Sequence, residues 1–92
     1  MAVRAQRHTH ENRPQQIREA NARLAREAKR LRFAARVPML CECEDSDCDE
    51  LFLMSLHDFY SAYDAFVTAP GHRVENAHPV RQDREFWLQR CD

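Results

Sequence analysis

The chain has 92 residues, of which 43% are hydrophobic and 32% are charged, with a formal net charge of −1. A chain of this length forms one small domain, which buries little apolar surface and is usually stabilised further by a metal or another cross-link. It contains no run of about 18 apolar residues and no secretory signal, so we expect a cytoplasmic protein with reduced cysteines and no membrane partner.

The charge is divided unevenly along the chain. Residues 1–36 contain ten Arg or Lys and three Glu, which gives +7, whereas residues 37–92 contain four Arg and twelve Asp or Glu, which gives −8. This asymmetry predicts either that the basic segment binds a polyanionic or acidic partner or that it folds over its own acidic body.

The first 36 residues contain a polar tail and one helical segment. Residues 1–13 are polar and are predicted to be a disordered tail. Pro14 suits the first turn of a helix, and the residues after it favour a helix that reaches about Ala34 within a basic amphipathic segment at 14–36. The basic side chains predicted to bind nucleic acid or another partner are Arg18, Arg23, Arg26, Lys29 and Arg30. The alternative is a solvated helix surface.

The apolar positions of this helix also allow self-association. Ile17, Leu24 and Leu31 are seven residues apart, and Asn21 would occupy the other core position of a heptad. This pattern is typical of a short parallel coiled coil and therefore of a homodimer. It covers fewer than three heptads, which favours a helix packed on its own domain.

The next segment predicts a hairpin followed by a helix. Residues 37–41 form a candidate edge strand, because Pro38 cannot donate to a ladder, and residues 50–54 form a second strand. Ser55 and Asp58 have the spacing of a helix N-cap. The positions predicted to form an aromatic core face on this helix are Leu56, Phe59, Tyr60, Tyr63, Phe66 and Val67.

The remaining segment predicts one turn, one loop and a closing strand. Residues 66–68 can form a strand before Pro70 and Gly71 turn the chain. Residues 73–84 are predicted to be a loop. Residues 85–90 are predicted to be the closing strand.

Three cysteines and one histidine predict a metal site. Cys41, Cys43 and Cys48 lie within eight residues, and His72 follows the Pro-Gly turn. Three thiolates and one imidazole are ligands typical of structural zinc, which leaves no open position for catalysis. The sequence therefore predicts zinc bound by these four side chains. The alternatives for the fourth ligand are His57, His78 and Cys91.

Together, these residues resemble an uncharacterised family of small bacterial zinc-binding proteins. The shared pattern is Cys-x-Cys-x4-Cys, an aromatic helix and a Phe-Val-x-x-Pro-Gly-His segment, and it covers about residues 33–90. The resemblance implies that His72 is the fourth ligand and implies no activity. The chain differs from the family at residues 55–57, where it has Ser-Leu-His in place of a Leu-Thr-type sequence. It also has a longer segment after His72, and this segment contains His78, which therefore remains an alternative fourth ligand.

The sequence thus predicts an α+β fold, with a long basic N-terminal helix followed by a zinc-stapled antiparallel sheet packed on one amphipathic helix at 37–92. We expect a binding module rather than an enzyme, because no phosphate loop, nucleophile motif or credible carboxylate pair is present. The expected partners are RNA, DNA or an acidic protein surface, in a nucleoprotein machine such as the ribosome or a transcription complex. The alternative is a protein adaptor or a homodimer formed through the N-terminal helix.

Overall fold

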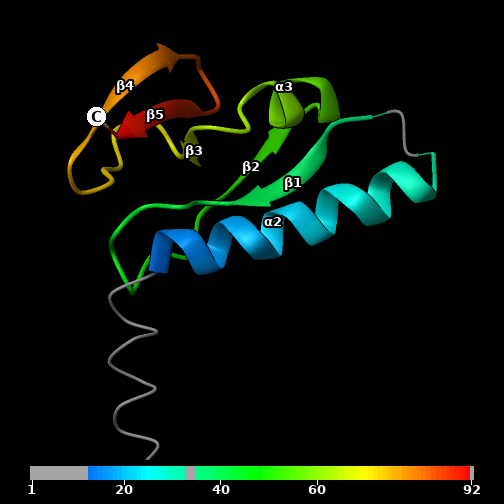
Figure 1. The fold of residues 1–92 in the computed structure, drawn as a ribbon, viewed down its shortest axis with the longest axis horizontal. Coiled ribbons are helices and arrows are strands. Elements are labelled where there is room, and N and C mark those ends of the chain that lie inside the picture. The colour runs from blue at the N-terminus through cyan, green and yellow to red at the C-terminus, as the bar shows by residue number, and fades with distance from the viewer. Residues whose placement is uncertain (1–12, 33–34, 92) are drawn as a thin grey trace, which may run out of the picture.

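The computed structural model describes residues 13–32 and 35–91 and has an α+β fold (Figure 1). The predicted disordered tail lies, apart from Arg13, outside the described residues. The elements in chain order are α2 (Arg13–Arg30), β1 (Val37–Leu40), β2 (Leu51–Met54), α3 (Leu56–Ser61), β3 (Phe66–Thr68), β4 (Ala77–Gln82) and β5 (Trp87–Cys91). They form one long helix, one short helix and two small antiparallel sheets.

Helix α2 lies along the β1–β2 hairpin and packs on its own domain (Figure 1). Its buried residues are Pro14, Asn21, Ala25 and Ala28. The helix ends at Arg30, before the predicted end near Ala34, because Arg32 takes the left-handed conformation with φ 57° and its N–H bonds to the Lys29 carbonyl at 3.0 Å. Asn21, which the heptad pattern assigned to a coiled-coil core, is buried within the chain itself.

The predicted hairpin is confirmed. Val37 pairs with Met54 and Met39 with Phe52, and these four side chains point into the core. The amide of Asn21 bonds both backbone groups of Leu40, with Nδ2 donating to the carbonyl and Oδ1 accepting from the N–H, each at 2.8 Å. This side chain thus occupies the free edge of β1 as a neighbouring strand would, which protects the edge from pairing with other chains.

Helix α3 begins where the sequence predicts but is much shorter. Ser55 caps it by accepting a hydrogen bond from the Asp58 N–H at 3.0 Å. The helix is only six residues long, and the chain turns at Ala62 before β3 begins. The prediction of a continuous aromatic core face is therefore wrong, since Tyr60 is 43% and Tyr63 is 81% exposed.

The second sheet has the strand order β3–β5–β4. The prediction that residues 73–84 form a loop is wrong, because Ala77–Gln82 pairs with β5. A register shift between Pro79 and Arg81 accommodates the proline, which lacks an N–H donor. As an outer strand, β4 is largely exposed, so its sequence carries no apolar alternation.

The core lies between the two sheets, and both helices contribute side chains to it. Phe52 of the hairpin stacks against Phe86, just before β5, with ring centroids 6.2 Å apart. Met39, Met54 and Val67 are fully buried around them. The hydrophobic core thus joins both sheets to α2 and α3.

Candidate metal centre and the basic surface of α2

The four predicted ligands converge from three separate segments. Cys41 directly follows β1, Cys43 lies two residues further, and Cys48 lies in the loop that returns to β2. His72 comes from the turn after β3, where Gly71 has φ 84°. Such a conformation strains residues with a side chain, so this glycine allows the tight turn that brings the histidine over the hairpin loop.

The ligand atoms of Cys41, Cys43, Cys48 and His72 all lie within 4.8 Å of one another. The Nδ1 atom of His72 lies 3.5 Å from Sγ of Cys41 and 3.5 Å from Sγ of Cys48. A tetrahedral zinc ion with ordinary bond lengths separates its sulfur and nitrogen ligands by about 3.5 Å. The four side chains are therefore close enough to hold a metal ion, and their chemistry and spacing are compatible with zinc.

The alternative fourth ligands lie elsewhere. His57 is exposed on α3, His78 is exposed on β4, and Cys91 is exposed at the end of β5. Within the described residues, the cluster that could hold a metal contains His72 and none of these three.

The surroundings of Cys41 and Cys48 favour the protonated form of each thiol. Burial raises the pKa of Cys41 to about 12 and also raises the pKa of Cys48. The N–H of Ala69 donates to Cys41 Sγ at 3.2 Å, a contact that stabilises a thiolate once it forms. Metal binding at this site should therefore release protons and weaken as the pH falls.

The loop that carries His72 is fixed by a buried glutamine. Gln89 of β5 donates from Nε2 to the His72 carbonyl at 2.6 Å and to Thr68 Oγ1 at 2.9 Å, and its Oε1 accepts from the Val74 N–H at 3.4 Å. Gln89 is fully buried. Sequence reasoning missed this residue, because a single glutamine in a short closing strand gives no signal of its partners.

A second residue that sequence reasoning missed is Glu42, which lies between two of the cysteines and is fully buried. Its carboxylate accepts hydrogen bonds from Asn21 Nδ2 and from the Val67 N–H, each at 2.8 Å. Burial raises its pKa to about 7, and the positive charge of Arg18 acts in the opposite direction. The sequence did contain a signal for Glu42. Successive side chains of an extended chain point to opposite sides, so a residue between two clustered cysteines faces away from them.

Arg18 is one of the five predicted partner-binding residues, and it points into the molecule. Its Nη1 lies 3.6 Å from Glu42 Oε1, and its Nη2 donates to the Ala62 carbonyl at 2.7 Å. The guanidinium also lies 4.6 Å from the centre of the Phe59 ring. Its side chain is only 14% exposed, so Arg18 joins α2 to the body of the domain.

Arg13 joins the start of α2 to the loop that carries the cysteines. Its guanidinium donates to the carbonyls of Cys43 and Cys48, the latter at 3.0 Å. Each carbonyl belongs to a candidate ligand, so these hydrogen bonds join the start of α2 to the candidate metal centre.

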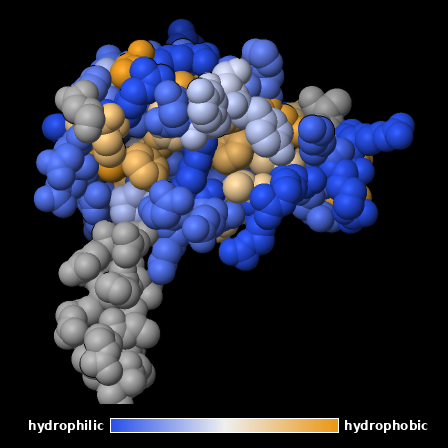
Figure 2. Space-filling view, viewed as in Figure 1, coloured by the Kyte–Doolittle hydropathy of each residue, from blue (hydrophilic) through white to orange (hydrophobic). Residues whose placement is uncertain are grey.

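The other four predicted residues form an exposed basic surface. Arg23, Arg26, Lys29 and Arg30 line a shallow groove of about 720 Å³ together with Glu27 and Tyr60. The Lys29 ammonium lies 5.6 Å from the centre of the Tyr60 ring, and Arg30 pairs with Glu27. We call this region the basic groove. The surface over α2 is predominantly hydrophilic in Figure 2.

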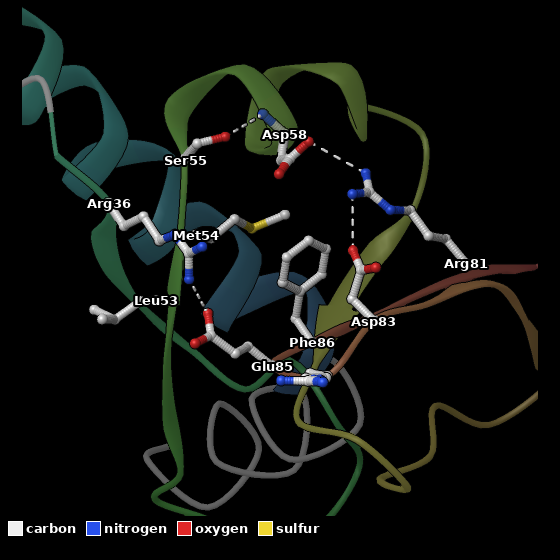
Figure 3. Close-up of a pocket in the computed structure, with 10 residues that line it drawn as sticks. Arg36, Leu53, Met54, Ser55, Asp58, Arg81, Asp83, Glu85 and Phe86 are labelled. Carbon is white, nitrogen blue, oxygen red and sulfur yellow. Dashed lines mark hydrogen bonds and ion pairs between the residues drawn. The ribbon is translucent and has the colours of Figure 1, made fainter.

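A separate cleft of about 460 Å³ lies between the hairpin and the β4–β5 turn (Figure 3). Its ionised groups largely satisfy one another, since Arg36 pairs with Glu85 and Arg81 bridges Asp58 at 3.2 Å and Asp83 at 2.7 Å. These ion pairs connect the hairpin and α3 to the second sheet, and Arg84 also lines the cleft.

No protein-family model, no curated protein and no solved structure matches this chain. Among the described residues, no helix has the length and apolar character needed to cross a bilayer.

Proposed function

We propose that the protein is a non-enzymatic, zinc-stabilised binding module whose basic groove contacts the phosphates of a nucleic acid, free or within a nucleoprotein machine such as the ribosome or a transcription complex. The observation that carries this proposal is the division of the cationic residues on α2. Arg18 is used internally, whereas Arg23, Arg26 and Lys29 remain exposed on one surface. Zinc holds the platform that supports this surface, because three thiolates and one imidazole form a closed tetrahedral set.

The basic groove has the two components that single-stranded nucleic acids need. Guanidinium and ammonium groups neutralise phosphates, and an exposed aromatic ring stacks on a base. Tyr60 supplies that ring, is 43% exposed, and lies beside Lys29. No base-reading motif accompanies them, so we expect binding with little sequence specificity.

The test is a titration of the full chain against an arbitrary single-stranded RNA and an arbitrary DNA duplex at several salt concentrations. The variant Arg23→Glu/Arg26→Glu should bind more weakly. The slope of log affinity against log salt concentration should also become shallower, by up to about 0.9 for each phosphate contact that is lost. Tyr60→Leu should lose about 1–3 kcal/mol on the single strand and little on the duplex.

The matched control is Arg84→Glu/Arg90→Glu, which changes the net charge equally at exposed positions outside the groove. Equal losses in both double variants would mean that binding follows net charge alone, and absence of binding at low salt would refute the proposal. Deleting α2 is not a suitable test, because Asn21 and Arg18 contact buried Glu42.

A protein adaptor is the second candidate, favoured by apolar side chains that α2 leaves exposed. Leu24 is 42% and Leu31 is 62% exposed. A protein partner that contacts these leucines would bind equally well before and after nuclease treatment, which separates this function from nucleic-acid binding.

A further inference from the structure

Four of the large apolar side chains that the structure describes as exposed are leucines on two neighbouring elements. Leu24 and Leu31 belong to α2 and are 42% and 62% exposed, and Leu51 and Leu53 belong to β2 and are 59% and 46% exposed. Exposed apolar groups gathered in one region of a small protein are typical of an interaction surface.

The leucines of α2 lie on the flank of the helix that faces away from α3. Arg18 and Lys29 contact the rings of Phe59 and Tyr60 and so define the flank next to α3. At about 100° per residue, Leu24 and Leu31 fall on the other side of the buried strip that contains Asn21.

The leucines of β2 lie on the outer face of the hairpin. Pro38 pairs with Leu53 and Leu40 pairs with Leu51, on the face opposite to the buried side chains. Because Asn21 binds the backbone of Leu40, the outer face of the hairpin adjoins the leucine flank of α2. This combined surface is called the leucine face, and its residues are Ile17, Leu24, Leu31, Pro38, Leu40, Leu51 and Leu53.

We propose that the leucine face binds the same face of a second copy of this chain across a two-fold axis. The charges at its two ends favour this partner. Arg32 is exposed at the end where α2 finishes, and Asp49 and Glu50 are exposed at the opposite end, where β2 begins. A two-fold axis through the middle of the face brings the basic end of each copy onto the acidic end of the other. An isologous interface requires such self-complementarity.

This dimer differs from the coiled coil that the heptad pattern predicted. Asn21 is inside the domain, so the interface uses one flank of α2 together with the hairpin rather than two helices alone. The basic groove lies on another side of α2 and stays open, so the dimer presents two grooves to one polyanion. Two linked grooves bind one polyanion more tightly than a single groove does. Dimerisation itself does not depend on nucleic-acid binding.

The first experiment measures the mass of the full, metal-loaded chain by sedimentation equilibrium over a wide range of concentration, in a Cys91→Ser background that excludes a disulfide through this exposed thiol. The mass should rise from 10.9 kDa toward twice that value. Leu53→Asp should weaken dimerisation by about 100-fold, as expected for a central interface residue. Val80→Asp is the matched control, since Val80 is 43% exposed outside the leucine face, and it should dimerise like the parent chain.

The second experiment exchanges the charges at the two ends. Arg32→Glu and Glu50→Arg should each weaken self-association, because each places like charges at both contacts. An equimolar mixture of the two variants should associate as well as the parent chain, since both contacts are then restored. Both variants change exposed side chains only, so they test the arrangement even where Leu53→Asp perturbs folding.

A constant mass of 10.9 kDa at every concentration would overturn the proposal. The same result is expected if residues outside the described part of the chain cover the leucine face, and the proposal is then equally wrong. A mixture that associates no better than its components would overturn the two-fold arrangement. Neither result bears on nucleic-acid binding, which is measured separately with the groove variants.

Discussion

Both sides of α2 carry arginines, but the inner arginines make contacts within the domain and the outer arginines are exposed to solvent. On the inner side, Arg13 and Arg18 bond backbone carbonyls and lie beside a candidate ligand and a buried carboxylate. On the outer side, Arg23 and Arg26 are exposed at the basic groove. An arginine that contacts buried acceptors affects stability, whereas an exposed one affects only what the surface attracts.

The largest expected effect comes from losing the zinc that we propose at the cysteine cluster, since Arg13 contacts the carbonyls of two of its candidate ligands. Cys43→Ser, or metal removal by a chelator, should cost on the order of 5 kcal/mol or more, because ligand bonds contribute directly to folding. That is comparable to the whole stability of a small domain, so we expect loss of tertiary structure, measured by near-ultraviolet circular dichroism and reversed by adding zinc.

Cys91→Ser is the matched control for this change, since Cys91 is exposed and lies outside the metal cluster. It should melt like the parent chain. Unchanged melting of the metal-free protein would show that the hydrophobic core and the inner side of α2 are stable without the metal.

A smaller effect is expected from Asn21→Leu, which keeps the number and branching of the side-chain heavy atoms and removes the amide. The N–H and carbonyl of Leu40 and one oxygen of Glu42 would lose their partners in a buried region. Unsatisfied buried groups of this kind should cost about 3–5 kcal/mol, measured by urea denaturation. Gln16→Leu, at an exposed position of the same helix, should change stability by less than about 0.5 kcal/mol.

The smallest expected effect compares the two kinds of arginine directly. Arg18→Gln should cost about 2–3 kcal/mol, because it leaves Glu42 without its nearby cation, whereas Arg26→Gln should cost less than about 0.5 kcal/mol. Equal effects in urea denaturation would contradict the distinction between the two sides of α2.

The pH dependence of Arg18→Gln has a definite sign. Burial raises the pKa of Glu42 from 4.5 to about 7, so its protonated form favours the folded state and this stability is lost as the pH rises through about 7. Without the Arg18 charge the pKa rises further, so the deficit of the variant relative to the parent chain should be larger at about pH 8 than at about pH 6.

The sequence by itself determined the local features of this protein. The spacing of Cys41, Cys43 and Cys48 and the Pro-Gly turn before His72 indicated the four candidate ligands, because a clustered cysteine pattern and a tight turn are local features. The contact between His72 and the cysteines is long-range, since His72 lies 31 residues after Cys41. The hairpin and the cap at Ser55 followed from local propensity and hydrogen bonding.

Only the tertiary structure decided which polar side chains face inward. Arg18 and Arg23 are equivalent in helix propensity and charge, and their different positions depend on where Glu42 and Ala62 lie, more than eighteen residues away. Gln89 and the pairing of β4 depend in the same way on long-range neighbours. Local sequence determines conformation through short-range sterics and hydrogen bonding, whereas burial is set by partners that only the folded chain brings together.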